Sequence, residues 1–362
     1  MAIENINGIA DAVAPELEAN LVKLPPEALV EGVTELDDGS AIIGEMEMES
    51  ETPIALPFDA NLAEHIDEDV LSEISSELTG NIEDDINSRS DWEEQYKGGL
   101  ELLGMSYEDR SEPFEGASGI VHPLLAESVT QFQAQAYREM LPAGGPVKTS
   151  IIGAETPEVT AQAERVKNYM NYQITYEMEE YDPELDQMLF YLPIVGSAFK
   201  KVYFDPTMQR AVSKFVHSED LIVPYSATDL ATATRITHCI RMDKNEIKKL
   251  QLSGFYKDID LPSSGADSDG MNDVKDTIND IEGITSSSSQ NEEMMIYEVH
   301  TNLDIEGFED IGADGEPTGL KMPYIVTIME DTGDVLSIKR NFNESDPLRR
   351  KVPYFVHYKF LP

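Results

Sequence analysis

The side chains best suited to binding a metal ion or transferring protons are six histidines. They are spread along the chain, at His65, His122, His217, His238, His300 and His357. None of them has a second histidine at the spacing of a zinc motif such as H-E-x-x-H, and the chain contains neither a Walker loop nor a Rossmann glycine fingerprint. Acidic residues are so frequent that neighbouring carboxylates carry little information by themselves. We therefore expect a protein that is not an enzyme, with no catalytic residue, no metal site and no cofactor.

Two short motifs come close to known sites and fail on spacing. The run 116–119 contains Ser118 but has a glycine directly after it, whereas a nucleophile elbow needs glycines two residues away on each side. The run 265–276 places several aspartates where a calcium loop would have its ligands. Its first position is Gly265 and its last is Asp276, so it lacks the carboxylate and the glutamate required at its two ends. We expect neither a serine nucleophile nor a calcium ion here.

Basic residues are rare, and two groups of them stand out. The pair Lys200-Lys201 lies in a predicted strand, where it could contact DNA or, more ordinarily, protect a solvated strand edge. The second group combines Lys339-Arg340 with residues 349–351. It is a candidate for docking or for phosphate contact, and neutralisation of neighbouring acids explains it equally well.

Three tyrosines follow one flank of a predicted helix, at Tyr169, Tyr172 and Tyr176. At this spacing they could stack on nucleic-acid bases. Proteins that bind single strands surround such aromatics with lysine and arginine, whereas residues 177–182 are acidic. Packing between helices or between subunits is the favoured interpretation.

The charge balance excludes a broad surface that grips nucleic-acid phosphates. The net charge is −44, from 26 basic and 70 acidic residues, and the pI is near 4.2. Half of this excess lies in residues 1–88, where 23 acidic residues face a single basic one, Lys23. Dense acid, scattered proline and few aromatics predict a largely disordered arm with a brief helical tendency near residues 62–78. Such an arm binds a partner or simply solvates the protein.

Cysteine content and hydropathy bear on the cellular compartment. A lone Cys239 excludes an intrachain disulfide and fits a reducing compartment. The first residues lack the basic region of a signal peptide. The longest apolar run, 189–199, is interrupted by Pro193 and is shorter than the roughly 18 residues of a spanning helix. We expect no membrane association.

One long helix organises the chain. His122-Pro123 opens it and the proline- and glycine-rich run 142–146 closes it. Apolar side chains recur along one face at steps of three and four, at Val121, Leu125, Val129, Phe132, Ala136 and Met140. Its other faces carry amides and small side chains, which suggests that protein surrounds the helix on several sides. Further helices are predicted at 90–104, from Thr156-Pro157 onward and at 182–192.

Strand patterns fall on both sides of a Ser-, Asp- and Gly-rich segment. Before it, a hairpin is predicted over residues 198–216 and a strand at 236–241; after it, strands are predicted at 294–301, 324–329, 335–340 and 352–360. The fold class expected is α+β. Four parts are predicted: a largely disordered acidic arm (1–88), a helical and strand-containing region (89–257), a mobile insertion (258–291) and an antiparallel β region (292–362).

Three stretches resemble portal proteins of tailed phages, of the short-tailed type. They are GIVHPLLAESVTQFQAQAYREMLPAGGPVKT from residue 119, YLPIVGSAFKKVYFDP from residue 191, and VSKFVHSEDLIVPYSATDLATATRITHCIRM from residue 212. With the helix predicted at 90–104, the resemblance covers about residues 89–362. Residues 1–88 carry none of it.

The resemblance implies a portal-like fold, with 89–257 similar to the wing and 292–362 similar to wing or clip. It implies a ring of twelve subunits at one capsid vertex of the virion, assembled in the host cytoplasm, through which double-stranded DNA is packaged and ejected. The partners implied are terminase, a neck or tail adaptor, the major capsid protein and scaffold, and DNA in transient, non-specific contact. It also implies that this chain is the N-terminal part of a longer protein and stops before the stem and crown helices.

Two other hypotheses remain open from the residues alone. The first is an acidic scaffold or adaptor protein of the virion that has no DNA channel. A portal must close a ring, whereas an adaptor need not, so the state of assembly separates the two. The second is a metal-dependent nuclease that uses clustered carboxylates, which an assay for magnesium-dependent DNA cleavage would reveal.

Overall fold

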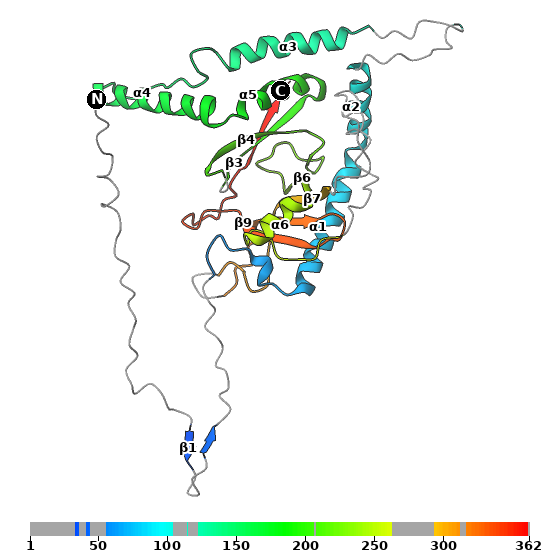
Figure 1. Cartoon of the computed structure of the whole chain (residues 1–362), viewed down its shortest axis with the longest axis vertical. Coiled ribbons are helices and arrows are strands. Elements are labelled where there is room, and N and C mark those ends of the chain that lie inside the picture. Colours follow the sequence, from blue (N-terminus) through cyan, green and yellow to red (C-terminus); the bar gives the residue numbers. More distant parts are fainter. Residues whose placement is uncertain are drawn as a thin grey trace, which may run out of the picture. The chain divides into compact units, whose positions relative to one another are not determined.

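The computed structural model describes residues 56–103, 114, 122–205, 208–262, 293–311 and 316–360, together with the backbone of two short strands nearer the N-terminus (Figure 1). The chain divides into two units, Met1–Leu56 and Pro57–Pro362. In the first unit, β1 (Val33–Glu35) and β2 (Ala41–Ile43) form an antiparallel pair. All helices and strands after β2 belong to the second unit.

The helices of the second unit are η1 (Leu62–Glu64), α1 (Glu68–Ser88), α2 (Ser90–Leu103), α3 (Leu124–Met140), α4 (Pro157–Tyr172), the π-helical turn η2 (Gln173–Glu177), α5 (Tyr181–Val195) and α6 (Lys244–Leu252). The four predicted helices are present and begin within a few residues of their predicted starts, whereas η1 and α1 lie in the segment that was predicted to be largely disordered. The predicted start of α4 is confirmed, because the Thr156 hydroxyl accepts a hydrogen bond from the Val159 N–H at 3.3 Å. None of the helices in the described residues is long and apolar enough to cross a membrane.

Two antiparallel sheets form the centre of the unit, and the α+β class is confirmed. The three-stranded sheet has the order β10 (Phe355–Lys359), β3 (Ser197–Asp205), β4 (Arg210–Val216). The five-stranded sheet has the order β5 (Leu221–Ile222), β6 (Arg235–Asp243), β7 (Glu293–Leu303), β8 (Met322–Met329), β9 (Val335–Arg340). The predicted strands are therefore present, most within a few residues of their expected ends.

The predicted boundary between residues 89–257 and 292–362 is wrong, because both sheets cross it. β6 pairs with β7 along its whole length, and β10 returns to pair with β3. The predicted insertion also starts too early. Residues 258–262 pack on the core through Ile259 and Leu261, and the rest of the insertion, including the calcium-like run, lies outside the described residues. Strand pairing between distant segments leaves no local signal, which is why the sequence suggested two separate regions.

Folded structure also begins earlier than predicted, within the supposed arm 1–88. α1 is a helix of 21 residues that buries Leu71, Leu78 and Ile82. Ahead of it, the Asn61 side chain donates to the Leu336 carbonyl at 3.1 Å and accepts from the Ile338 N–H at 3.0 Å, as a neighbouring strand would. It thus covers the open edge of β9. The apolar stripe of α1 is narrow and its other faces are acidic, so composition alone concealed it.

The organising helix α3 packs on α5 through one face, as predicted. Phe132 and Ala136 contact the core cluster around Leu185, Met188 and Leu189 of α5. Within this single chain its other faces are open, and Val129 is its one buried residue. α5 in turn is tied to β4 by carboxylates: Glu184 accepts from the Phe215 N–H at 2.5 Å. The expectation of protein on several sides of α3 is therefore not met by one chain.

Lys200 and Lys201 do not protect a solvated edge, because β3 is the central strand of its sheet. Lys200 is 2% exposed, and its Nζ lies 4.2 Å from the centroid of the Tyr181 ring. Nζ has no hydrogen-bond partner in the described part of the chain. Burial lowers the pKa of this amine to about 8, although the carboxylates of Glu184 and Glu180 oppose the shift. A buried cation without a hydrogen bond should reduce stability.

We predict that Lys200→Met stabilises the protein at pH 7 by about 1–3 kcal/mol. Below pH 8 both the folded and the unfolded chain carry this charge, and only the folded chain holds it away from water. Between pH 8 and 10.5 the folded chain loses the proton first, so wild-type stability rises with pH and the advantage of the variant disappears. Urea unfolding at pH 7 and pH 10 measures this. Lys214→Met, at an exposed position of β4, is the matched control, and equal effects of the two substitutions would contradict the prediction.

Candidate functional site

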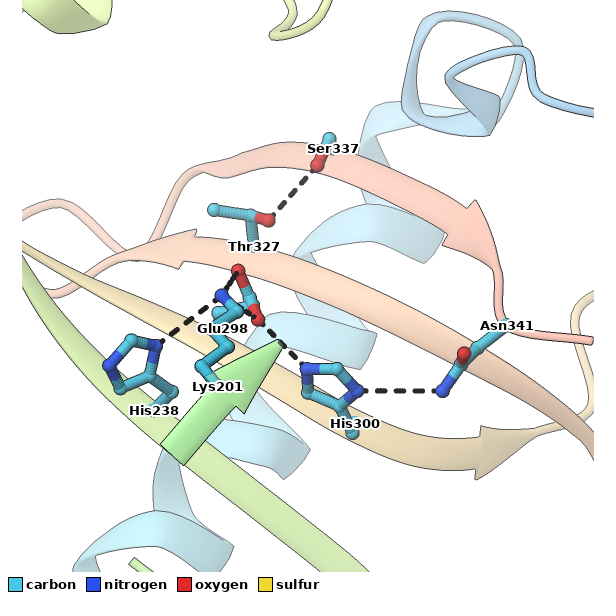
Figure 2. Close-up of polar contacts among 7 residues, drawn as sticks. All are labelled: Lys201, His238, Glu298, His300, Thr327, Ser337 and Asn341. Carbon is cyan, nitrogen blue, oxygen red and sulfur yellow. Dashed lines mark hydrogen bonds and ion pairs between the residues drawn. The ribbon is translucent and has the colours of Figure 1, made fainter. Parts of the chain in front are cut away.

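A row of polar side chains crosses the five-stranded sheet at a single register (Figure 2). His238 of β6 is paired with Glu298 of β7, Glu298 with Thr327 of β8, and Thr327 with Ser337 of β9. Side chains at paired positions of neighbouring strands lie on the same face. The Ser337 hydroxyl donates to the Thr327 hydroxyl at 3.0 Å. Most of the surrounding positions on these strands are apolar and buried, so this row is an exception inside the core.

Lys201 reaches this row from the other sheet. Its Nζ lies 2.7 Å from both carboxylate oxygens of Glu298, and the two side chains are 13% and 19% exposed. The same Nζ is 3.5 Å from Nδ1 of His238. Lys200 and Lys201 are neighbours on one strand, so they point to opposite faces, one toward α5 and the other toward Glu298. The ion pair therefore links β3 of the three-stranded sheet to β7 of the five-stranded sheet.

His300 completes the cluster two residues along β7. Its Nε2 lies 2.8 Å from Glu298, and its Nδ1 lies 3.4 Å from the amide nitrogen of Asn341. The amide nitrogen of Asn341 can only donate, so Nδ1 of His300 is the acceptor. Nε2 of His300 then carries the proton that is donated to Glu298. Figure 2 shows the resulting chain of contacts from His238 through Lys201 and Glu298 to Asn341.

The charges in this cluster depend on one another. Burial by itself raises the pKa of Glu298, but the Lys201 ammonium and the hydrogen bond from His300 outweigh it and hold this pKa well below its ordinary value. Burial, together with the adjacent Lys201 ammonium, lowers the pKa of His238 to about 4. At neutral pH Glu298 is therefore an anion and His238 is neutral.

The arrangement is suited to holding the sheets together rather than to binding a metal. Among the described residues, no group of three or more His, Cys, Asp or Glu side chains is placed to hold a metal ion. Lys201 already occupies both oxygens of Glu298. We interpret the cluster as a structural link whose charges satisfy one another.

No contact of His238 or His300 with Glu298 was predicted from the sequence. The signal that was available is the alternation in β7, where Glu298 and His300 stand two residues apart in an otherwise largely apolar strand. Such a pair on one face of a buried strand indicates a polar partner from elsewhere. Of the other histidines, His217 and His357 lie against the aromatic rings of Phe215 and Phe199.

The second predicted basic group is divided among several environments. Lys339 lies over the Phe255 ring at 3.1 Å, and Arg340 donates to the Phe58 carbonyl at 2.9 Å. Arg350 donates to Asp346 at 2.8 Å, which is the local neutralisation considered above. Arg349 and Lys351 instead line a cavity at one end of the five-stranded sheet.

The described surface feature that differs most from an ordinary monomer is α4. None of its 16 residues is buried. It carries an apolar stripe that the described residues leave uncovered, with Val159, Val166 and Met170 exposed by 38%, 43% and 42%. Tyr169, Tyr172 and Tyr176 are exposed as well. The serine run 116–119 lies outside the described residues.

Comparison with known proteins gives no relative for this chain, since neither a protein-family model nor a curated protein matches it.

We predict that acid unfolds the protein partly through His238. Its pKa is about 4 in the folded chain and ordinarily 6.5, so between these values the unfolded chain takes up a proton that the folded chain refuses. Wild-type stability should therefore fall by up to about 3 kcal/mol as the pH drops from 6.5 to 4. His238→Gln should flatten this part of the curve, measured by urea unfolding at half-unit pH steps. His122→Gln, at an exposed position, should leave the curve unchanged; parallel curves for wild type and His238→Gln would contradict the assignment.

We further predict strong coupling between Lys201 and Glu298. Lys201→Met and Glu298→Gln should each cost about 3–5 kcal/mol, because each leaves a buried charge or acceptor without its partner, and the double variant should cost clearly less than their sum. The exposed pair Lys248 and Asp258, 2.8 Å apart, is the control, and its coupling should stay below about 1 kcal/mol. Additive effects at Lys201 and Glu298 would show that the pair does not link the sheets.

Proposed function

We propose that the protein is a portal protein of a tailed phage, which assembles into a ring at one capsid vertex and forms the channel for double-stranded DNA. The resemblance of residues 119–149, 191–206 and 212–242 to that family supports the proposal. One structural observation adds to it: α4 is a complete helix with an apolar face that none of the described residues covers.

The uncovered apolar face of α4 is suited to contact with another molecule. A helix in a soluble protein normally buries its apolar stripe, because most helical stability comes from packing that face. Here Val159, Val166 and Met170 stay exposed over the length of α4. Exposed tyrosines continue the surface past its end, where the rings of Tyr172 and Tyr176 stack with centroids 5.7 Å apart. Aromatic and apolar side chains of this kind are enriched in the centres of protein interfaces.

α4 is held firmly enough to present this face. The Asn171 side chain pairs with the backbone of Val147, accepting from its N–H at 2.9 Å and donating to its carbonyl at 3.2 Å. The same side chain lies against Gly145, where an added Cβ would come within 2.5 Å of it and where φ is +89°. A glycine is needed at this close approach. The turn between α3 and α4 is thus fixed to α4 itself.

A second copy of the chain is the partner that the proposal assigns to α4. A contact between different faces of identical subunits produces a ring when its rotation closes. By resemblance the ring has twelve subunits, and terminase, a neck or tail adaptor, the major capsid protein and scaffold are its partners. The net charge of −44 suits a channel, because an acidic wall repels phosphates and does not hold the duplex that slides past.

The alternative is an acidic scaffold or adaptor protein of the virion without a channel. It would use the same uncovered helix to dock on another protein, and the acidic composition fits it equally well. The state of assembly of the protein by itself separates the two functions.

We predict that the full-length product of this reading frame forms closed rings, and that Val166→Glu with Met170→Glu reduces their abundance at least tenfold by placing charge in the subunit contact. Mass photometry and negative-stain imaging at moderate salt measure this. Thermal unfolding of the dissociated subunit should change little, because both side chains are exposed in the single chain.

The matched control is Asn168→Glu, an exposed position on the opposite side of α4, where the same kind of charge should leave the rings intact. Rings unaffected by the stripe substitutions would separate α4 from assembly. A stable monomer or dimer of the unmodified protein would reject the portal function and favour the adaptor.

A further inference from the structure

A cavity of about 300 Å³ lies at one end of the five-stranded sheet. Three parts of the chain line it: the loop 231–234 ahead of β6, the adjoining ends of β7 and β8, and the turn 348–351 that follows β9. It is separate from the buried cluster of Lys201 and Glu298 and from the surface of α4, since it shares no lining residue with either.

Three basic residues, Lys321, Arg349 and Lys351, are among those that line this cavity. Such a concentration is unusual in a chain with 26 basic and 70 acidic residues. Lys351 is anchored by its ammonium, which donates to the carbonyls of Leu230 at 3.3 Å and Ala233 at 3.5 Å. Lys321 is exposed and makes no hydrogen bond or ion pair with any other described residue.

Arg349 is held in a conformation that an arginine seldom adopts. Its φ is +48°, in the left-handed region. The turn around it is fixed by Asp346, whose carboxylate accepts from the Leu348 N–H at 3.1 Å and the Arg350 N–H at 3.2 Å. A strained backbone that its surroundings hold in place points to a role for the side chain it carries.

The Arg349 guanidinium keeps donors free for a ligand. One terminal nitrogen donates to the Glu344 carbonyl at 3.1 Å, and its Nε lies 3.8 Å from an Asp310 carboxylate oxygen. The group also packs over the Phe342 ring at 5.3 Å. Since a guanidinium has five N–H donors, these contacts leave several of them unused. Thr234 and Asn302, which line the cavity, add neutral hydrogen-bonding groups.

We propose that this cavity binds a phosphoryl group. Basic side chains from separate segments suit a tetrahedral phosphate anion, whose oxygens point in several directions, whereas a planar carboxylate is satisfied by one arginine. The volume is at the lower limit for small-molecule sites, so the cavity has room for a phosphoryl group and part of the molecule that carries it. The group can belong to a free phosphate or to a nucleic-acid backbone. This inference does not depend on the proposed ring, because a single chain contains every residue involved.

The test is isothermal titration of the full-length protein, at constant ionic strength, with inorganic phosphate, pyrophosphate and a short DNA duplex as separate probes. The variants are Lys321→Gln and Arg349→Asn. Asparagine tolerates the left-handed conformation but carries no charge, so this variant should fold and unfold at a temperature no lower than wild type. Each variant should weaken binding about tenfold, the loss expected for one charged hydrogen-bonding partner.

Lys148→Gln is the control, because it removes the same charge from an exposed position that does not line the cavity. Saturable binding of a phosphate probe that weakens in both variants and persists in Lys148→Gln supports the site. If the duplex shows the same dependence, a nucleic-acid backbone is the source of the group; if only the small anions do, it is a free phosphate. No saturable binding of any probe to the wild type, or equal losses in Lys148→Gln, overturns the proposal.

Discussion

The ion pair between Lys201 and Glu298 is the constraint on which the arrangement of the two sheets depends. Both groups are largely withdrawn from water, which is costly unless each finds its partner with good geometry. That geometry exists only when β3 lies against the correct position of β7. A slip of β3 by one residue would bring Lys200 toward Glu298 and turn Lys201 toward Tyr181. The pair therefore selects one packing of the sheets over its neighbours, even where its net contribution to stability is small.

The same constraint explains which parts of the structure could be predicted from the sequence. The start of α4 at Thr156 and Pro157 and the apolar strands β8 and β9 follow from local patterns, and their positions were predicted correctly. The partners of Lys201 and His238 were not, because they lie on strands separated from them by 97 and 60 residues of sequence. Nothing in a local pattern distinguishes a lysine at a solvated edge from one that enters a core. The pairing of β3 with β10 was missed for the same reason.

A second source of error was the average composition of long segments. Residues 1–88 were treated as one acidic arm, yet Leu71, Leu78 and Ile82 need only one narrow stripe to attach α1 to the sheet, while its carboxylates remain in water. The same applies to the basic residues near the C-terminus. They looked like one patch, but the strand and turn geometry places Lys339 over an aromatic ring and sends Arg349 and Lys351 to the cavity. Charge counts describe a segment, whereas function depends on where each side chain points.

The distribution of burial within the second unit connects the fold to assembly. Leu185, Met188 and Leu189 of α5 are almost fully buried between α3 and the three-stranded sheet, whereas α4, joined to α3 by residues 141–156, has no buried residue. A chain that had to be stable only by itself would gain from folding α4 back onto its own surface. Instead the contacts of Asn171 with Val147 and Gly145 fix the C-terminal end of α4, and the apolar stripe stays uncovered. Packing another molecule against this stripe would stabilise the helix further, and this is the contact that the proposed ring assigns to α4.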